Sequence, residues 1–207
     1  MRQLKDRPTQ LKMNNKFVNY FSKISPLTEV ESNAIADNMC IKTFKKGDFL
    51  LKKGQLSVDT YFIMEGCVRE YIVLDGEEKT TNFFTEEQWI ISLNNFSYQT
   101  PSETNLICVE DTTVSVGNEE QAQKMFKIFP RFETIARAIM ETDFTEQKKQ
   151  LTSYLTDSPE NRYLKLLKSR PDIFQRVPQY QIASYIGVKP ESLSRIRKRI
   201  SLTGDVM

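Results

Sequence analysis

The clearest hydrophobic pattern in the chain lies between Gln179 and Ile200, in the stretch QYQIASYIGVKPESLSRIRKRI. Spacings of three and four residues separate most of its apolar positions, which predicts two short helices; these positions are Ile182, Ile186, Val188, Leu193 and Ile196. Gly187 stands between the two patterns, where a left-handed residue can end the first helix. Ala183 is small enough to let a second helix cross closely, and Pro190 suits the first turn of that helix. The layout is typical of a helix-turn-helix.

The second of these helices has two distinct faces. At about 100° per residue, Leu193, Ile196 and Ile200 fall on one apolar stripe. The opposite side is polar and contains Glu191, Ser194, Arg195 and Lys198, with Arg199 at its margin. From Lys189 to Ile200 there are five basic residues and one acidic residue, whereas the net charge of the whole chain is only +2. A basic, outward-facing helix suits the major groove of DNA. The alternative is a solvated helix end whose cations favour the helix dipole.

The middle of the chain, from Cys40 to about Val116, has a different pattern. Short β-branched and aromatic runs alternate with turns that contain glycine. The turn glycines are spaced by about 7 to 12 residues, which is typical of a compact antiparallel all-β domain; they are Gly47, Gly54, Gly66 and Gly76. Asp75-Gly76, between YIVL and KTTNFF, is a strong signal for a β-hairpin.

Helical patterns flank this β region. We expect a flexible arm over residues 1–15, short helices over 16–24 and 27–39, and another helix over 118–129. A long helix is predicted over 132–155, and it would span roughly 36 Å. Its apolar stripe consists of Phe132, Ile135, Ile139, Phe144, Leu151 and Leu155. Pairing with a second copy would cover a stripe of this length, although packing within its own chain is the alternative. Ser158 followed by Pro159 predicts the start of the next helix.

The composition excludes several kinds of chemistry. The chain has no histidine and three widely spaced cysteines. Histidine-dependent nucleophiles, histidine-ligated zinc and histidine-ligated haem are therefore excluded, and no metal or cofactor is expected. Cysteines without ligand or redox spacing favour a reducing cytoplasm. We find no apolar run of about 20 residues for a membrane span and no apolar core of a signal peptide. The sequence argues against an enzyme.

A β-roll-like region, a long helix and a helix-turn-helix follow one another in this order. The chain thus resembles the Crp/Fnr family of bacterial transcription regulators, through the pieces GDFLLKKGQ, DTYFIMEGCVREY and RVPQYQIASYIGVKPESLSRIRKRI. The resemblance implies an α+β fold with a cyclic-nucleotide-binding-like antiparallel β-roll (a jelly roll) over 16–130. It also implies a dimerisation helix over 131–155 and a C-terminal (winged) helix-turn-helix domain over 156–207, and whether a wing is present stays open.

The resemblance assigns roles on the recognition helix. Glu191 and Arg195 fall where the family places side chains that read bases. Arginine can form two hydrogen bonds to guanine, and a carboxylate can accept one from cytosine. The candidate phosphate contacts are Gln179, Lys189, Ser192, Lys198 and Arg199, and Ser194 shares the exposed face. Arg197 lies off this face and is a weaker candidate.

The effector region departs from the family's cyclic-nucleotide binders. Ile91-Ser92 replaces their Gly-Glu pair, and Pro101-Ser102-Glu103 stands where their arginine would be. No lysine or arginine occurs from Thr80 to Gln123, and burying an unpaired anion costs several kcal/mol. We therefore expect no cyclic AMP binding by the usual mode. The degenerate pocket would lie around Trp89, Ile91, Ser92, Ser102 and Glu103, with Trp89 as a core aromatic in preference to a ligand-stacking residue.

Together these patterns predict a cytoplasmic, sequence-specific transcription regulator that binds palindromic double-stranded DNA as a homodimer. RNA polymerase is a further candidate partner, and the identity of a small-molecule effector stays open. Two alternatives remain. One is a small-molecule sensor that acts through a protein partner and not through DNA. The other is an enzyme with a pocket in the β-roll, which the missing histidines disfavour.

Overall fold

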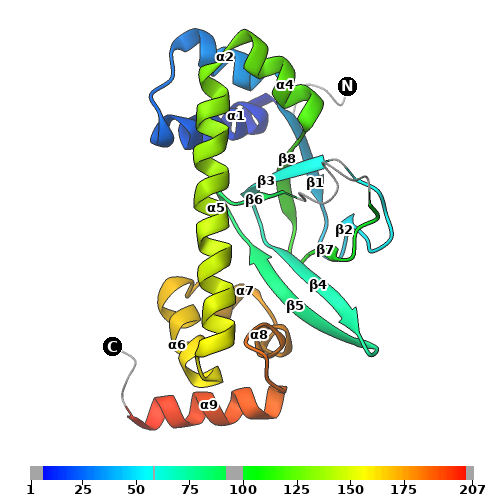
Figure 1. Cartoon of the computed structure of the whole chain (residues 1–207), viewed down its shortest axis with the longest axis vertical. Helices are drawn as coiled ribbons and strands as arrows, with labels where there is room; N and C mark the ends of the chain where they lie inside the picture. Colours follow the sequence, from blue (N-terminus) through cyan, green and yellow to red (C-terminus); the bar gives the residue numbers. More distant parts are fainter. Residues whose placement is uncertain (1–6, 58, 92–99, 204–207) are drawn as a thin grey trace.

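The computed structural model describes residues 7–57, 59–91 and 100–203. In Figure 1 the long helix α5 runs along the molecule, with α1, α2 and α4 at one end, α6 to α9 at the other, and the strands along one side. The helices are α1 (Arg7–Ile24), α2 (Glu29–Asp37), α4 (Glu119–Ile128), α5 (Arg131–Thr156), α6 (Pro159–Ser169), α7 (Ile173–Arg176), α8 (Gln179–Tyr185) and α9 (Pro190–Thr203). The strands are β1 (Cys40–Phe44), β2 (Phe49–Leu51), β3 (Asp59–Glu65), β4 (Val68–Leu74), β5 (Glu77–Phe84), β6 (Trp89–Ile90), β7 (Asn105–Cys108) and β8 (Thr112–Asn118).

The strands form the predicted antiparallel β-roll from two four-stranded sheets. Their orders are β1-β8-β3-β6 and β2-β7-β4-β5. The hairpin between β4 and β5 turns at Asp75 and Gly76, whose φ angles of 53° and 79° are both positive. Two residues with positive φ match the right-handed twist of the flanking strands, and this explains the Asp-Gly pair. Between the sheets lies an apolar core that includes Leu51, Ile63, Val68, Phe84, Leu106 and Val114.

The expectation of a flexible arm over residues 1–15 was wrong from Arg7 onwards. Helix α1 begins at Arg7 and continues to Ile24. Met13 and Phe17 are buried in a cluster that also contains Phe62 of β3, and the rings of Phe17 and Phe62 are 4.9 Å apart. Burial of two apolar side chains against the β-roll stabilises this segment as a helix. Residues 1–6 lie outside the described residues.

Two helix starts predicted from capping residues are confirmed. Thr28 caps α2, and the Glu31 carboxylate accepts a hydrogen bond from the Thr28 backbone N–H at 2.8 Å, which completes a capping box. Ser158 caps α6 ahead of Pro159 at the first helical position. Both caps satisfy backbone N–H groups that have no partner within the helix.

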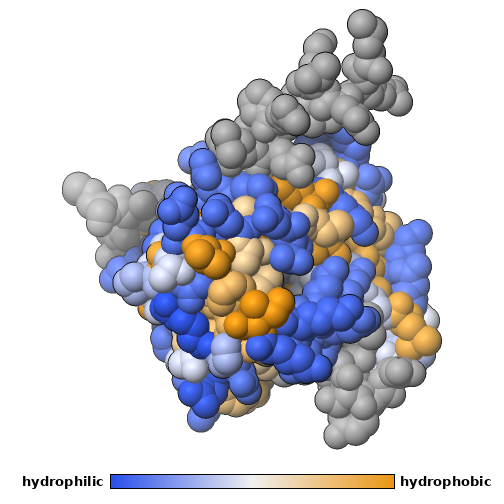
Figure 2. Space-filling model, turned by 90° about the horizontal axis from the view of Figure 1, so that it is seen from above, coloured by the Kyte–Doolittle hydropathy of each residue, from blue (hydrophilic) through white to orange (hydrophobic). Residues whose placement is uncertain are grey.

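Helix α5 has 26 residues, and its two halves differ in burial. The N-terminal half is buried against the rest of the chain through Phe132, Ile135 and Ile139. The alternative prediction, that the apolar stripe packs within its own chain, is therefore confirmed for this half of the helix. The C-terminal half leaves large apolar side chains exposed, namely Met140, Phe144, Leu151, Tyr154 and Leu155. Figure 2 views the opposite end of the molecule, where apolar atoms also reach the surface among hydrophilic ones.

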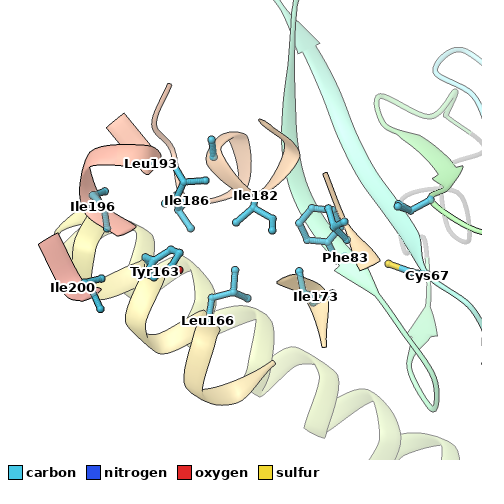
Figure 3. Packing of buried hydrophobic residues seen from close by; sticks show 13 residues of the cluster. Cys67, Phe83, Tyr163, Leu166, Ile173, Ile182, Ile186, Leu193, Ile196 and Ile200 are labelled. Atoms are coloured by element: carbon cyan, nitrogen blue, oxygen red, sulfur yellow. The ribbon is translucent and has the colours of Figure 1, made fainter. Parts of the chain in front are cut away.

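One apolar core joins the β-roll to the C-terminal helices. Phe83 of β5 and Cys67 belong to the same buried cluster as Ile173 of α7 and Ile182 of α8. Figure 3 shows Phe83 pointing from its strand toward Ile182 and Ile173. The rings of Phe83 and Tyr185 lie 5.4 Å apart. The helix-turn-helix is thus packed on the outer face of the β4–β5 hairpin.

Residues 156–203 contain only helices and their connections, so no strand of a wing lies in this described part of the chain. The β4–β5 hairpin of the N-terminal domain covers α8 instead. Residues 204–207 lie outside the described part of the chain.

Candidate nucleic-acid interface

The turn between α8 and α9 is a Schellman motif, built as the sequence predicts. Gly187 has φ of +77°. The N–H of Val188 donates to the carbonyl of Ala183 at 2.9 Å, and the N–H of Gly187 donates to the carbonyl of Ser184 at 3.1 Å. These two bonds satisfy carbonyls at the end of α8 and require a left-handed residue between them. The motif fixes the angle at which α9 leaves α8.

The two-faced pattern of α9 is confirmed. Leu193, Ile196 and Ile200 are buried and pack in the shared core. On the opposite side, Glu191, Ser194, Arg195, Lys198 and Arg199 are exposed, as is Lys189 just before the helix. The buried stripe holds the helix in place, while the cationic side chains project into solvent. This face can reach the base edges and phosphates of a duplex groove.

Several of the predicted contact residues already have partners within the chain. Gln179 accepts a hydrogen bond from Arg197 at 3.0 Å, Ser194 donates to the Pro190 carbonyl at 3.1 Å, and Arg199 forms an ion pair with Glu160 at 2.9 Å. Ser192 is only partly exposed. The exposed face near the start of α9 therefore centres on Glu191, Arg195 and Lys198.

Polar contacts orient the helix-turn-helix on the β-roll. Ser184 of α8 accepts from the Thr80 N–H at 2.9 Å and donates to the Glu78 carbonyl at 3.1 Å. Arg170, which follows α6, donates to the Phe83 carbonyl at 2.7 Å and to Thr85 Oγ1 at 3.0 Å. These bonds satisfy polar groups at the edge of the shared apolar core. The position of α8 is thus set by strand β5.

An ion-pair network also connects the C-terminal helices to the β-roll. Arg176 of α7 lies 2.8 Å from Glu86 and 2.5 Å from Glu110, and both carboxylates belong to the β-roll. Burial by itself would raise the pKa of Glu86. Hydrogen bonds from Arg176 and from backbone N–H groups favour the charged carboxylate, and they leave this pKa below its ordinary value. The network links the two domains most strongly when Glu86 is ionised.

The predicted effector region lines a groove of about 2720 Å³ between the β-roll and α5. Trp89, Ile91, Ser102 and Glu103 all line it, whereas Ser92 lies outside the described residues. The Trp89 ring is 5.0 Å from Phe62 and 5.8 Å from Phe17, so it packs as the predicted core aromatic. Ser102 donates through Oγ to the Thr104 carbonyl at 2.9 Å, which gives it a structural role in its loop.

Sequence reasoning missed Glu70, which also lines this groove. Glu70 lies in β4, where its Oε2 accepts a hydrogen bond from Thr81 Oγ1 at 2.8 Å. The signal was available, because Val68, Glu70 and Ile72 alternate with outward residues along the predicted strand. A carboxylate at an inward position of a β-strand is unusual enough to mark a candidate site.

Cysteine and acidic side chains are the metal ligands and reactive groups that this histidine-free chain could offer. Among the described residues, no three histidine, cysteine or acidic side chains lie together as metal ligands. Burial raises the pKa of Cys67 to about 12 and that of Cys108 to about 11, so both thiols stay protonated at neutral pH. Within the same described ranges, none of the helices is long and apolar enough to cross a membrane.

Residues 41–128 match the family model described as the cyclic nucleotide-binding domain. The chain as a whole has the fold seen in solved structures of Crp/Fnr transcription regulators.

Similar solved structures support this assignment of the fold. FixK2 from Bradyrhizobium japonicum is 15% identical, with a TM-score of 0.65 over 80% of this chain and 86% of that one. CLP from Xanthomonas campestris, a c-di-GMP-responsive global regulator, is 16% identical, with a TM-score of 0.67 over 86% and 93%. A Crp/Fnr-family regulator from Eubacterium rectale is 19% identical, with a TM-score of 0.66 over 90% and 89%. No curated protein sequence matches the chain.

Proposed function

We propose that this protein is a sequence-specific DNA-binding transcription regulator that acts as a homodimer. The observation that carries the proposal is the exposed cationic face of α9, set on a buried apolar stripe next to a Schellman turn. Arg195 is the residue assigned to base reading, with Glu191 beside it. Lys189 and Lys198 are assigned to phosphates, where a lysine acts as a point charge.

The exposed half of α5 supports self-association. Met140, Phe144, Leu151 and Tyr154 occupy d, a, a and d positions of a heptad, and Gln147 fills the intervening d position. Phe144 and Leu151 are 68% and 60% exposed, so the seam has no cover within the described chain. A second copy of α5 would bury both seams by the same contact, as a twofold interface does. Two recognition helices would then meet half-sites about 34 Å apart.

The groove supports a regulator that does not use cyclic AMP in the usual way. The segment from Thr80 to Gln123 contains no lysine or arginine. Arg69, on the neighbouring strand, is engaged with Thr80 and Glu78. A cyclic phosphate in this groove would meet the carboxylates of Glu70 and Glu103, while the β-roll cations that line it, Arg69 and Lys79, are already paired with Glu78 and Glu77.

The test begins with selection of bound sequences from random duplexes by the full-length protein. Fluorescence anisotropy then compares wild type, Arg195→Ala and Arg197→Ala on the selected site and on a scrambled duplex. The two variants remove the same charge from the same helix, but Arg197 is held by Gln179. We expect Arg195→Ala to lose about 1–3 kcal/mol on the selected site and to relax specificity at one base pair. Arg197→Ala should lose much less there.

On the scrambled duplex the two variants should behave alike, because non-specific affinity depends on charge alone. Equal losses from both variants on the selected site would contradict the assignment of Arg195. A protein that enriches no sequence and shows no preference over scrambled duplex at physiological salt would overturn DNA recognition. Action through a protein partner would then become the better explanation.

A further inference from the structure

The side chain of Glu70 points into the β-roll. On β4, Val68 and Glu70 are two residues apart and so face the same way. Val68 belongs to the core between the sheets, and so does Leu106 of β7, which is the partner of Glu70 in the pairing of β4 with β7. The residue between them, Arg69, faces the other side of the sheet, where it donates to Thr80 at 2.8 Å and pairs with Glu78 at 2.5 Å. The nearest cation along the strand is therefore turned away from Glu70.

The Glu70 carboxylate has little compensation for its burial. Thr81 Oγ1 donates one hydrogen bond at 2.8 Å. Among the described residues, no lysine or arginine forms an ion pair with Glu70. Burial raises its pKa, although the hydroxyls of Thr81 and Thr104 favour the charged form. A carboxylate has about four acceptor positions, so most of its capacity is free to accept bonds from a ligand.

Apolar side chains surround Glu70 on the β-roll side of the groove, and the lysine that β5 adds to the lining, Lys79, is paired with Glu77 at 2.5 Å. Leu51, Ile72, Phe84 and Leu106 line the groove together with Glu70. Lys148 and Lys149 of α5 line it from across, and Lys149 is paired with Glu146 at 2.6 Å. An acidic group at the edge of an apolar wall is complementary to a ligand with one cationic end and one apolar body.

We infer that the groove between the β-roll and α5 binds a small organic cation, an amidine, guanidine or amine on an apolar body, with Glu70 as its anchor. The cationic end would donate to the free oxygen positions of Glu70, and its apolar body would lie against Leu51, Ile72 and Phe84. An amidinium or guanidinium can form two parallel hydrogen bonds to one carboxylate, which adds geometric selectivity to the charge.

The position of Glu70 also offers a route to the helix-turn-helix. Glu70 and Thr80 lie on opposite faces of the same hairpin, and the Thr80 N–H donates to Ser184 of α8. A ligand that forms hydrogen bonds with Glu70 and Thr81 would shift strand β5, which holds α8. This regulatory consequence rests on the proposed function, whereas binding of the cation does not.

Isothermal titration calorimetry of the full-length protein tests the binding with two matched probes. Benzamidine carries the cation, and benzamide has the same shape without the charge. We expect benzamidine to bind wild type at least tenfold more tightly than benzamide. Glu70→Gln should remove most of this preference, while Glu103→Gln, which removes a carboxylate from the same groove, should change benzamidine affinity less than threefold.

Three outcomes would overturn the inference: equal affinity for the two probes, no detectable binding of either, or equal losses from Glu70→Gln and Glu103→Gln. Should Glu70→Gln fail to fold, as judged by circular dichroism, Thr81→Val serves as the second variant. It retains the carboxylate but frees the oxygen position that Thr81 occupies, so benzamidine should still bind in preference to benzamide. These measurements contain no DNA, so their failure is separate from a failure of DNA recognition.

Discussion

Replacing Phe83 with alanine removes the side chain that joins the β-roll to the helix-turn-helix. Phe83 is fully buried and stacks at a tilt on Tyr185 with ring centroids 5.4 Å apart. Truncating a buried phenylalanine costs about 3–5 kcal/mol, and the lost ring pair accounts for about 0.5–1.5 kcal/mol of that cost. We expect a loss of about 4 kcal/mol. That is a large share of the roughly 5–15 kcal/mol by which folded proteins exceed their unfolded states.

The cavity that Phe83→Ala would leave lies between the β-roll and the helix-turn-helix, and its position decides which of the two loses more stability. Most partners of Phe83 in its cluster belong to α6, α7, α8 and α9, while the β-roll keeps its own core between the sheets. The helix-turn-helix should therefore unfold at lower denaturant than the β-roll. Urea titration at fixed protein concentration can separate the two events. Fluorescence of Trp89, the single tryptophan, reports the β-roll, and circular dichroism at 222 nm reports mainly the helices.

In the wild type we expect the two signals to change together, and in Phe83→Ala the helical signal should change first. Val73→Ala is the control, because Val73 lies on the same hairpin but is 43% exposed; it should stay within about 0.5 kcal/mol of wild type. If Phe83→Ala shifts both signals equally, the two domains still unfold together and the predicted separation is wrong. A shift of less than about 1 kcal/mol would show that Phe83 contributes little to the contact between them.

Three further predictions follow from local geometry. Gly187→Ala should destabilise by about 1–2 kcal/mol, because φ is +77° and the new Cβ would lie 3.1 Å from a Tyr154 oxygen; Gly47→Ala, at φ +88° with open space around it, should cost less in the same thermal melt. The free energy of unfolding of wild type should exceed that of Glu86→Gln by its full amount at pH 7. The difference should fall once the pH drops below about 4.3, because a lowered carboxyl pKa stabilises the fold only above the pKa of the unfolded state. A difference that stays constant down to about pH 3.5 would contradict this. Leu151→Asp should shift the protein toward monomer in analytical ultracentrifugation and weaken palindrome binding, and an unchanged sedimentation coefficient would exclude the α5 seam.

Local patterns in the sequence were sufficient to predict the helices and the turn that form the candidate site. The spacing of Ile182, Ile186, Leu193 and Ile196, with Gly187 between the pairs, predicted both helices and their turn, because capping and one-sided burial act over a few residues. The Asp75-Gly76 hairpin is equally local, since only the turn has to adopt positive φ. The charge on the outer face of α9 follows from the same helical period.

Contacts between distant segments could not be read from such patterns. Phe83 looked like any core aromatic of the β region, and only the tertiary structure shows that it faces α8 and not the interior of the β-roll. The helical continuation of the N-terminus, the pairing of Arg176 with Glu86, and the inward position of Glu70 all depend on surfaces that are far apart in sequence. Side-chain burial depends on which elements meet, and a periodic pattern fixes the face of each element but not its partner.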